Sequence, residues 1–130
     1  MKALTDTNAL LWIACAPDRL TESAERAIAD SDEVWFSIVN IWEIGLKLSK
    51  GGFHDLDVAP DWDRKLVPRL LEEGFRLMPV QVAHCRRVQD LPFHHKDPFD
   101  RMLVAQALEE GLDVISSDGQ FDAYGVRRIW

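Results

Sequence analysis

The chain has 130 residues, enough for one hydrophobic core with little room for a second, so we expect a single domain over residues 1–130. Hydrophobic residues make up 47% of the chain and charged residues 28%, and no apolar run approaches the roughly 18 residues of a membrane span. The formal net charge of -7 argues against a broad basic surface for nucleic acid, although a bound divalent cation would reverse the charge locally.

Short apolar runs alternate with helical patterns, which predicts an α/β domain with a central, mostly parallel sheet flanked by helices. Pro68 is expected to kink or break the helix that begins near Pro60, and Gly111 to end the last helix. Strands are expected at residues 2–5, 33–37, 75–80, 112–116 and 126–130. Helices are expected at residues 8–13, 22–29, 38–49, from 60 onward, 82–88 and 99–110.

Four acidic side chains stand out because they fall on four different predicted elements. Asp6 follows the first strand and Asp118 follows the fourth, so both should face the crevice at the carboxyl ends of parallel strands. Right-handed crossovers would bring Glu43, on the third helix, and Asp100, in the first turn of the last helix, over the same strand ends. Because a carboxylate buried without a partner costs several kcal/mol, their convergence suggests a divalent cation.

Each acid taken alone also has a structural explanation. Asp97 and Asp100 could cap the last helix, a role in which Asp contributes about 1 kcal/mol. Asp118 is a good turn residue, and Glu43 could pair with Lys47 on an exposed helical face. The coincidence of all four acids, rather than any one of them, favours a functional site.

The cysteines and histidines, which could also bind a metal, are not added to the four acids. Cys15 and Cys85 are isolated and lack metal-ligand spacing, so we expect buried or inert thiols, with neither a disulfide nor a zinc site. Adjacent histidines on a loop are more often exposed polar residues than ligands, so His94 and His95 are not assigned to the site. A set of carboxylates alone favours Mg²⁺ or Mn²⁺ over zinc.

Tryptophans are placed by the character of their surroundings. Trp12, Trp35 and Trp42 lie in apolar stretches and are expected in the core, whereas Trp62 and Trp130 could lie at a partner surface. The chain start lacks the apolar segment and cleavage site of a signal peptide, which predicts a cytoplasmic protein.

Four segments together resemble the successive motifs of PIN-domain ribonucleases, and more closely those of the VapC-type toxins of toxin–antitoxin modules. The Asp-Pro-Phe-Asp-Arg run that begins at Asp97 is the most distinctive of them. The resemblance extends over most of the chain, from Leu4 to Asp118, and it implies a PIN-like α/β fold. The segments are residues 2–8, 42–44, 95–107 and 115–118.

The resemblance implies a metal-dependent endoribonuclease, the toxin component of a type II toxin–antitoxin module, which hydrolyses RNA phosphodiester bonds and leaves a 5′-phosphate. It implies that Asp6, Glu43, Asp100 and Asp118 are catalytic and surround one or two Mg²⁺ or Mn²⁺ ions. The resemblance also implies auxiliary roles for three residues. Asp97 is an additional acid, and the Ser116 hydroxyl orients a carboxylate or phosphate oxygen. Asn8 occupies a position where similar toxins frequently have His.

Resemblance to these toxins also implies a homodimer and a cognate antitoxin that covers the acidic cleft. Leu10, Leu11, Trp12 and Trp62 are candidates for such protein surfaces, and core packing explains them equally well.

Two other functions remain open from the sequence. One is a catalytically silent PIN-like module that binds RNA or protein, which the presence of all four acids disfavours. The other is a magnesium-dependent phosphatase-type α/β domain in which Asp6 is phosphorylated, and the segment Asp6-Thr7-Asn8 lacks the second nearby Asp that this chemistry usually uses.

Overall fold

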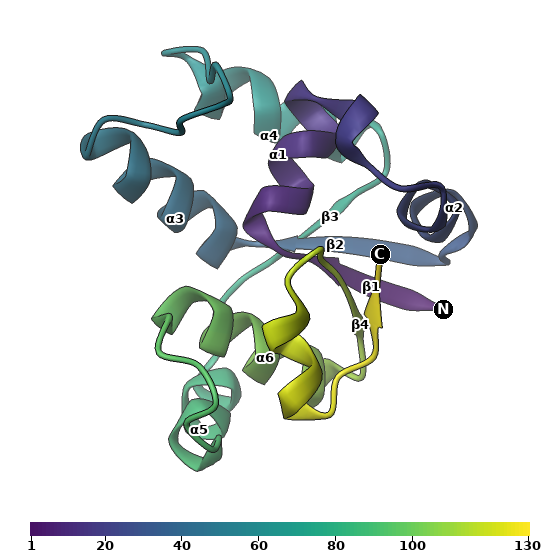
Figure 1. Ribbon diagram of the computed structural model, residues 1–130, viewed down its shortest axis with the longest axis vertical. Coiled ribbons are helices and arrows are strands. Elements are labelled where there is room, and N and C mark those ends of the chain that lie inside the picture. The colour runs from purple at the N-terminus through teal and green to yellow at the C-terminus, as the bar shows by residue number, and fades with distance from the viewer.

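The computed structural model describes all 130 residues and contains one five-stranded sheet with helices on both faces (Figure 1). The strands are β1 (Lys2–Thr5), β2 (Glu33–Ser37), β3 (Arg76–Met78), β4 (Asp113–Ile115) and β5 (Arg128–Ile129). The α-helices are α1 (Thr7–Cys15), α2 (Glu22–Asp30), α3 (Ile38–Ser49), α4 (Trp62–Glu72), α5 (Val82–Asp90) and α6 (Pro98–Glu110). Two 3₁₀-helices, η1 (Pro17–Arg19) and η2 (Gly119–Tyr124), complete the fold.

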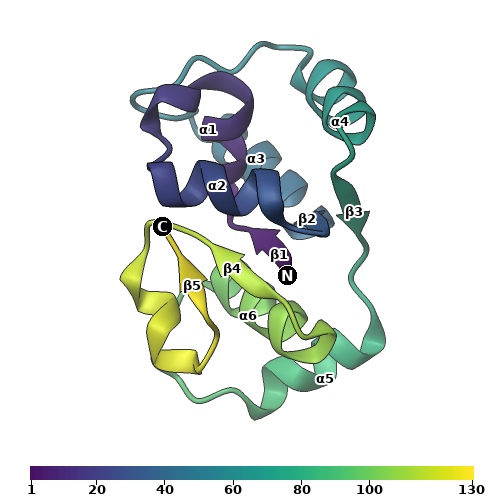
Figure 2. The same ribbon diagram turned by 90° about the vertical axis from the view of Figure 1, so that its right-hand side faces the viewer.

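The sheet has the strand order β3-β2-β1-β4-β5, and every neighbouring pair is parallel. The predicted α/β class is confirmed, and the sheet is entirely parallel rather than mostly so. Figure 2 shows β3 and β5 at opposite edges of the sheet. The strand order reverses direction between β1 and β4, whose last residues Thr5 and Ile115 are partners in the ladder. Open parallel sheets bind ligands beyond the carboxyl ends of such strands.

Helices cover both faces of the sheet, as a parallel sheet requires. In Figure 1, α1, α2 and α4 lie above the sheet and α5 and α6 below it. Successive strand residues point to opposite faces, so Ala3 packs in the core under α1 and α2 while Leu4 packs against α6. Both side chains are fully buried, which anchors β1 at the centre of the fold.

Local sequence signals explain several helix boundaries. Thr21 caps α2, as predicted, by accepting a hydrogen bond from the Ala24 backbone N–H at 3.1 Å. Ser37 and Asn40 form a capping box at the start of α3. Gly111 ends α6 with a positive φ of 69°, a conformation that glycine adopts without steric cost.

The helix break that Pro68 could have caused is absent. The helix α4 continues through Pro68 to Glu72, because its buried Leu66 and Leu70 anchor it on the core on both sides of the proline. Cys15 and Cys85 are free thiols and both are exposed, which excludes burial and leaves the other expectation, that they are inert, as a prediction. None of the helices combines the length and apolar character that crossing a bilayer requires.

Candidate active site

A polar pocket of about 190 Å³ lies beyond the carboxyl ends of β1 and β4. No hydrophobic residue lines it. The structure therefore brings together the four acids that sequence reasoning selected, and Ser116 lies directly beneath them through its contact with Asp6. The lining residues are Asp6, Thr7, Asn8, Glu43, Lys47, His95, Asp97, Asp100 and Asp118.

Asp6 is buried, follows β1 directly and caps α1. Its Oδ1 accepts the Ala9 backbone N–H at 2.8 Å, and its Oδ2 accepts the Ser116 hydroxyl at 2.5 Å. Burial raises the pKa of Asp6 to about 6, although these two hydrogen bonds favour the ionised form. The Asp6 side chain therefore both caps α1 and lines the pocket.

Glu43 reaches the pocket from the inner face of α3 and is almost fully buried. The Thr7 hydroxyl donates to Glu43 Oε1 at 2.5 Å, and the Asn40 side-chain amide donates to that Thr7 hydroxyl at 3.1 Å. Lys47 approaches Glu43 Oε2 at 3.1 Å. The predicted pairing with Lys47 is present, but on a buried carboxylate rather than on an exposed helical face.

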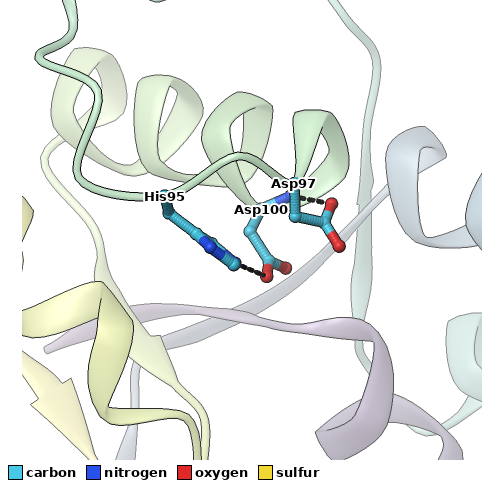
Figure 3. A group of neighbouring side chains, drawn as sticks. All are labelled: His95, Asp97 and Asp100. Atoms are coloured by element: carbon cyan, nitrogen blue, oxygen red, sulfur yellow. Dashed lines mark hydrogen bonds and ion pairs between the residues drawn. The ribbon is translucent and has the colours of Figure 1, made fainter.

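Asp97 and Asp100 lie together at the start of α6 (Figure 3). Asp97 caps the helix, with its Oδ1 accepting the backbone N–H groups of Phe99 at 2.8 Å and Asp100 at 3.2 Å. The Asp100 side chain points toward His95, whose Nε2 lies 2.8 Å from Asp100 Oδ2. Burial, followed by the neighbouring charges of Asp97 and Glu43, raises the pKa of Asp100 to about 7, against the opposing effect of the His95 hydrogen bond.

Asp118 closes the pocket from the turn after β4. Its carboxylate caps η2 by accepting the Gln120 backbone N–H at 2.9 Å, and its own backbone N–H donates to the Ser116 hydroxyl at 2.9 Å. Ser116 therefore links Asp6 and Asp118 through one oxygen. Asn8 is exposed and lines the pocket at the start of α1.

Four polar residues at the site were not selected from the sequence. Thr7 and Asn40 orient Glu43, Lys47 pairs with it, and His95 contacts Asp100. The interpretation of His95 as an exposed loop residue is wrong, since only 19% of its side chain is exposed, whereas His94 is exposed as expected. Thr7 and Lys47 had a sequence signal, because they lie next to Asp6 and one helical turn after Glu43.

The pocket concentrates negative charge that the protein itself balances only in part. Lys47 is the single ammonium group among the lining residues, against five carboxylates. Burial is the main cause of the raised pKa values of Asp6 and Asp100, and the neighbouring carboxylates raise both further. A divalent cation fits the donor set, because carboxylate oxygens are the ligands that Mg²⁺ and Mn²⁺ prefer.

An apolar groove of about 590 Å³ lies beside the pocket, between α3 and α6. Trp42 and Phe93 line it, with 63% and 86% of their surface exposed. The expectation that Trp42 lies in the core is therefore wrong. Trp42 lies one helical turn after Val39, on the side of α3 that lines the groove, and its ring packs on Phe99, with the ring centroids 4.8 Å apart.

The other tryptophans are partly buried. Trp62 and Trp130 pack against the core on one side of the sheet, and Trp35 packs against the core on the opposite side. Trp12 also contacts the ring of Trp130, with the centroids 5.4 Å apart. Leu10 and Leu11 are fully buried, so core packing explains these two residues.

The family model described as "PIN domain" matches residues 3–126 of the chain. This span includes all four acids, the strands β2, β3 and β4, and all of β1 except its first residue. No curated protein matches the chain by sequence.

Solved structures of toxin–antitoxin proteins are similar to the chain over nearly its whole length. The match with VapBC2 from Rickettsia felis has 10% identity and a TM-score of 0.66, covering 98% of this chain and 97% of the other. For DNA-bound VapBC from Salmonella typhimurium the identity is 17%, the TM-score 0.67 and the coverage 98% and 96%. VapC20 from Mycobacterium tuberculosis, a toxin that cleaves the sarcin–ricin loop, matches with 18% identity and a TM-score of 0.66, and the match covers 95% of both chains. At these identities the similarity establishes the fold.

Proposed function

The chain belongs to the PIN-domain family, and from this membership we propose that it is a metal-dependent endoribonuclease, the toxin of a type II toxin–antitoxin module. The observation that carries the proposal is the convergence of Asp6, Glu43, Asp100 and Asp118 in one polar pocket. These four side chains come from four separate segments of the chain, and no hydrophobic residue lies among them.

The four carboxylates are the residues that would hold a divalent cation. When bound, a Mg²⁺ or Mn²⁺ ion would activate water for attack on phosphorus and offset the negative charge that develops on the phosphoryl and leaving oxygens. Asp97 contributes as an additional acid that also fixes the first turn of α6.

The surrounding polar side chains hold the carboxylates in place before any ion arrives. Ser116 orients Asp6, and Thr7 orients Glu43. Such preorganisation matters because a carboxylate surrounded by others would otherwise turn away toward solvent. Lys47 and Asn8 lie at the pocket where they would contact a phosphate or ribose of the substrate.

RNA is the proposed substrate, and its backbone would be bound through the cation rather than through a basic surface. This accounts for an RNA-cleaving protein with a net charge of -7. A site that reads only a phosphodiester is indifferent to sequence, so target choice would come from contacts with unpaired bases around the pocket.

A cognate antitoxin and a second copy of the chain are the proposed protein partners, and the cytoplasm is the proposed location. Several solved proteins of this fold are toxin–antitoxin complexes, including VapBC2 of Rickettsia felis bound to promoter DNA. The exposed Trp42 and Phe93 add to this proposal, since contiguous exposed apolar surface commonly marks a protein interface.

The test is incubation of total RNA with the purified, partner-free protein in Mg²⁺ or Mn²⁺. Discrete fragments with 5′-phosphate ends, absent with EDTA and with Asp6→Asn, would support the proposal. Intact RNA despite measured binding of the ion would favour a silent RNA- or protein-binding module, and a phosphorylated Asp6 would favour the phosphatase-type alternative.

A further inference from the structure

We propose that His95 is a positioning residue that holds the Asp100 carboxylate in the orientation needed to bind the cation. This inference rests on the proposed metal-dependent function. It assigns to the imidazole a hydrogen bond to Asp100 and no direct bond to the ion.

The contact is direct and sheltered. His95 Nε2 lies 2.8 Å from Asp100 Oδ2, and the two side chains are only 19% and 18% exposed. Figure 3 shows the imidazole and the Asp97 carboxylate on opposite sides of Asp100. With Asp100 ionised, Nε2–H is the donor and Oδ2 the acceptor, which leaves Oδ1 without a hydrogen bond and available to a cation.

Asp100 depends on this contact more than Asp6 or Glu43 depends on any one partner, and the single partner of Asp118 is a backbone N–H rather than a side chain. Asp6 accepts hydrogen bonds from a backbone N–H and from Ser116, and Glu43 is held by Thr7 and Lys47. His95 is the only hydrogen-bond partner of the Asp100 side chain. Repulsion from the neighbouring carboxylates would turn an unsupported Asp100 toward solvent, so the imidazole is what keeps it in the pocket.

The backbone of His95 is itself fixed by contacts outside the pocket. Its N–H donates to the Tyr124 hydroxyl at 2.8 Å, and the same hydroxyl accepts a hydrogen bond from Arg101 Nη1 at 3.2 Å. The buried Arg101 guanidinium also donates to the backbone carbonyls of Leu91 and Pro92, in the segment that leads to His95. The imidazole therefore projects from an anchored segment, as a positioning residue requires.

The test measures Mn²⁺ affinity by titration calorimetry on the whole chain, for His95→Ala, His95→Gln and the wild type. Partners that orient a metal ligand typically change metal affinity by about 10–100-fold, so His95→Ala should weaken Mn²⁺ binding by that factor. His95→Gln places an amide N–H near the position of Nε2 and should bind Mn²⁺ within about threefold of the wild type.

His94→Ala is the matched control, because His94 precedes His95 directly, is exposed and contacts the ring of Tyr124 rather than Asp100. It should bind Mn²⁺ like the wild type. Thermal unfolding of each variant checks that a loss of affinity does not come from a loss of fold.

Unchanged Mn²⁺ affinity in folded His95→Ala would overturn the inference while leaving the proposed function intact. Equal loss in His95→Ala and His95→Gln would also overturn it, since a hydrogen-bond donor at this position would then not restore Mn²⁺ binding. If the wild type binds no Mn²⁺, the proposed function and this inference fail together.

Discussion

Ser116 and Asp6 are 110 positions apart in the sequence, and the Ser116 hydroxyl donates a hydrogen bond of 2.5 Å to Asp6 Oδ2. The contact joins the ends of β4 and β1, the two strands between which the strand order reverses. Since the Ala9 N–H holds the other oxygen of Asp6, both oxygens of this carboxylate are fixed by the fold. The fold therefore holds this carboxylate in a fixed position at the carboxyl ends of β1 and β4.

Replacing Ser116 by Ala should weaken the site without breaking the sheet. Asp6 would lose the hydrogen bond that favours its ionised form, so we expect Mg²⁺ affinity and RNA cleavage to fall by about 10-fold or more. Ser116→Thr, which keeps the hydroxyl, should retain most activity. The adjacent and exposed Ser117 is the control, and an equal loss in Ser117→Ala would argue against this role.

Asp100→Asn should raise the stability of the metal-free protein and weaken cation binding. Without metal, the variant should be more stable than the wild type near pH 7.5, by on the order of 1 kcal/mol, because one buried charge among like charges is removed. Added Mg²⁺ should stabilise the wild type, by about 2.7 kcal/mol at a hundred times its Kd, and the variant much less.

Thermal unfolding with and without Mg²⁺ measures both effects of the Asp100 substitution. Asp57→Asn makes the same change of charge at an exposed position and should behave like the wild type. Equal stabilisation of Asp100→Asn and the wild type by Mg²⁺ would exclude Asp100 from the cation site.

The metal-free protein should lose stability as pH rises from about 5 to 8. Burial raises the pKa of Asp6 to about 6 and that of Asp100 to about 7, from an ordinary value of 3.8. In this interval the folded protein still holds protons that the unfolded chain has released, so the free energy of unfolding falls as they dissociate. One pKa unit corresponds to about 1.36 kcal/mol, which gives a total loss on the order of a few kcal/mol.

Urea unfolding in EDTA at several pH values measures this dependence. The double variant Asp6→Asn with Asp100→Asn should remove most of the slope. A free energy of unfolding that instead rises with pH over this range would show that the two carboxyls are not destabilised by burial.

Arg101→Met should destabilise the fold, because the Arg101 guanidinium bonds backbone carbonyls and packs on Phe93 at 4.1 Å from the ring centroid. Loss of these contacts should cost about 2–4 kcal/mol in urea unfolding. Arg64 is exposed and serves as the control, since Arg64→Met should change stability by no more than about 0.5 kcal/mol.

The fold was largely predictable because its signals are local. An apolar run determines the structure of its own segment. A capping residue such as Thr21, or a helix-ending residue such as Gly111, determines a helix boundary within a few positions of it. The grouping of Asp6 with Asp118 was predictable for a different reason, since residues that follow parallel strands must meet at one edge of the sheet.

Contacts between side chains from distant segments were not predictable in this way. The bond from Ser116 to Asp6 could be anticipated only through resemblance to a family, and His95 gave no local sign that Tyr124 would anchor it. Trp42 was misplaced because α3 is apolar around most of its circumference, a pattern that reads as burial on all sides. Which side stays exposed depends on where α1 and α6 pack against α3, and these helices are distant from it in the sequence.

The catalytic role of the pocket is best tested by comparing RNA cleavage by the partner-free wild type and by Glu43→Gln in the same Mg²⁺ buffer. Gln keeps the shape of the side chain and removes the charge on the carboxylate that Thr7 and Lys47 hold. We expect fragments with 5′-phosphate ends from the wild type and a loss of at least about 100-fold in rate for folded Glu43→Gln. Cleavage at the wild-type rate by Glu43→Gln would contradict the assignment of this pocket as the catalytic site.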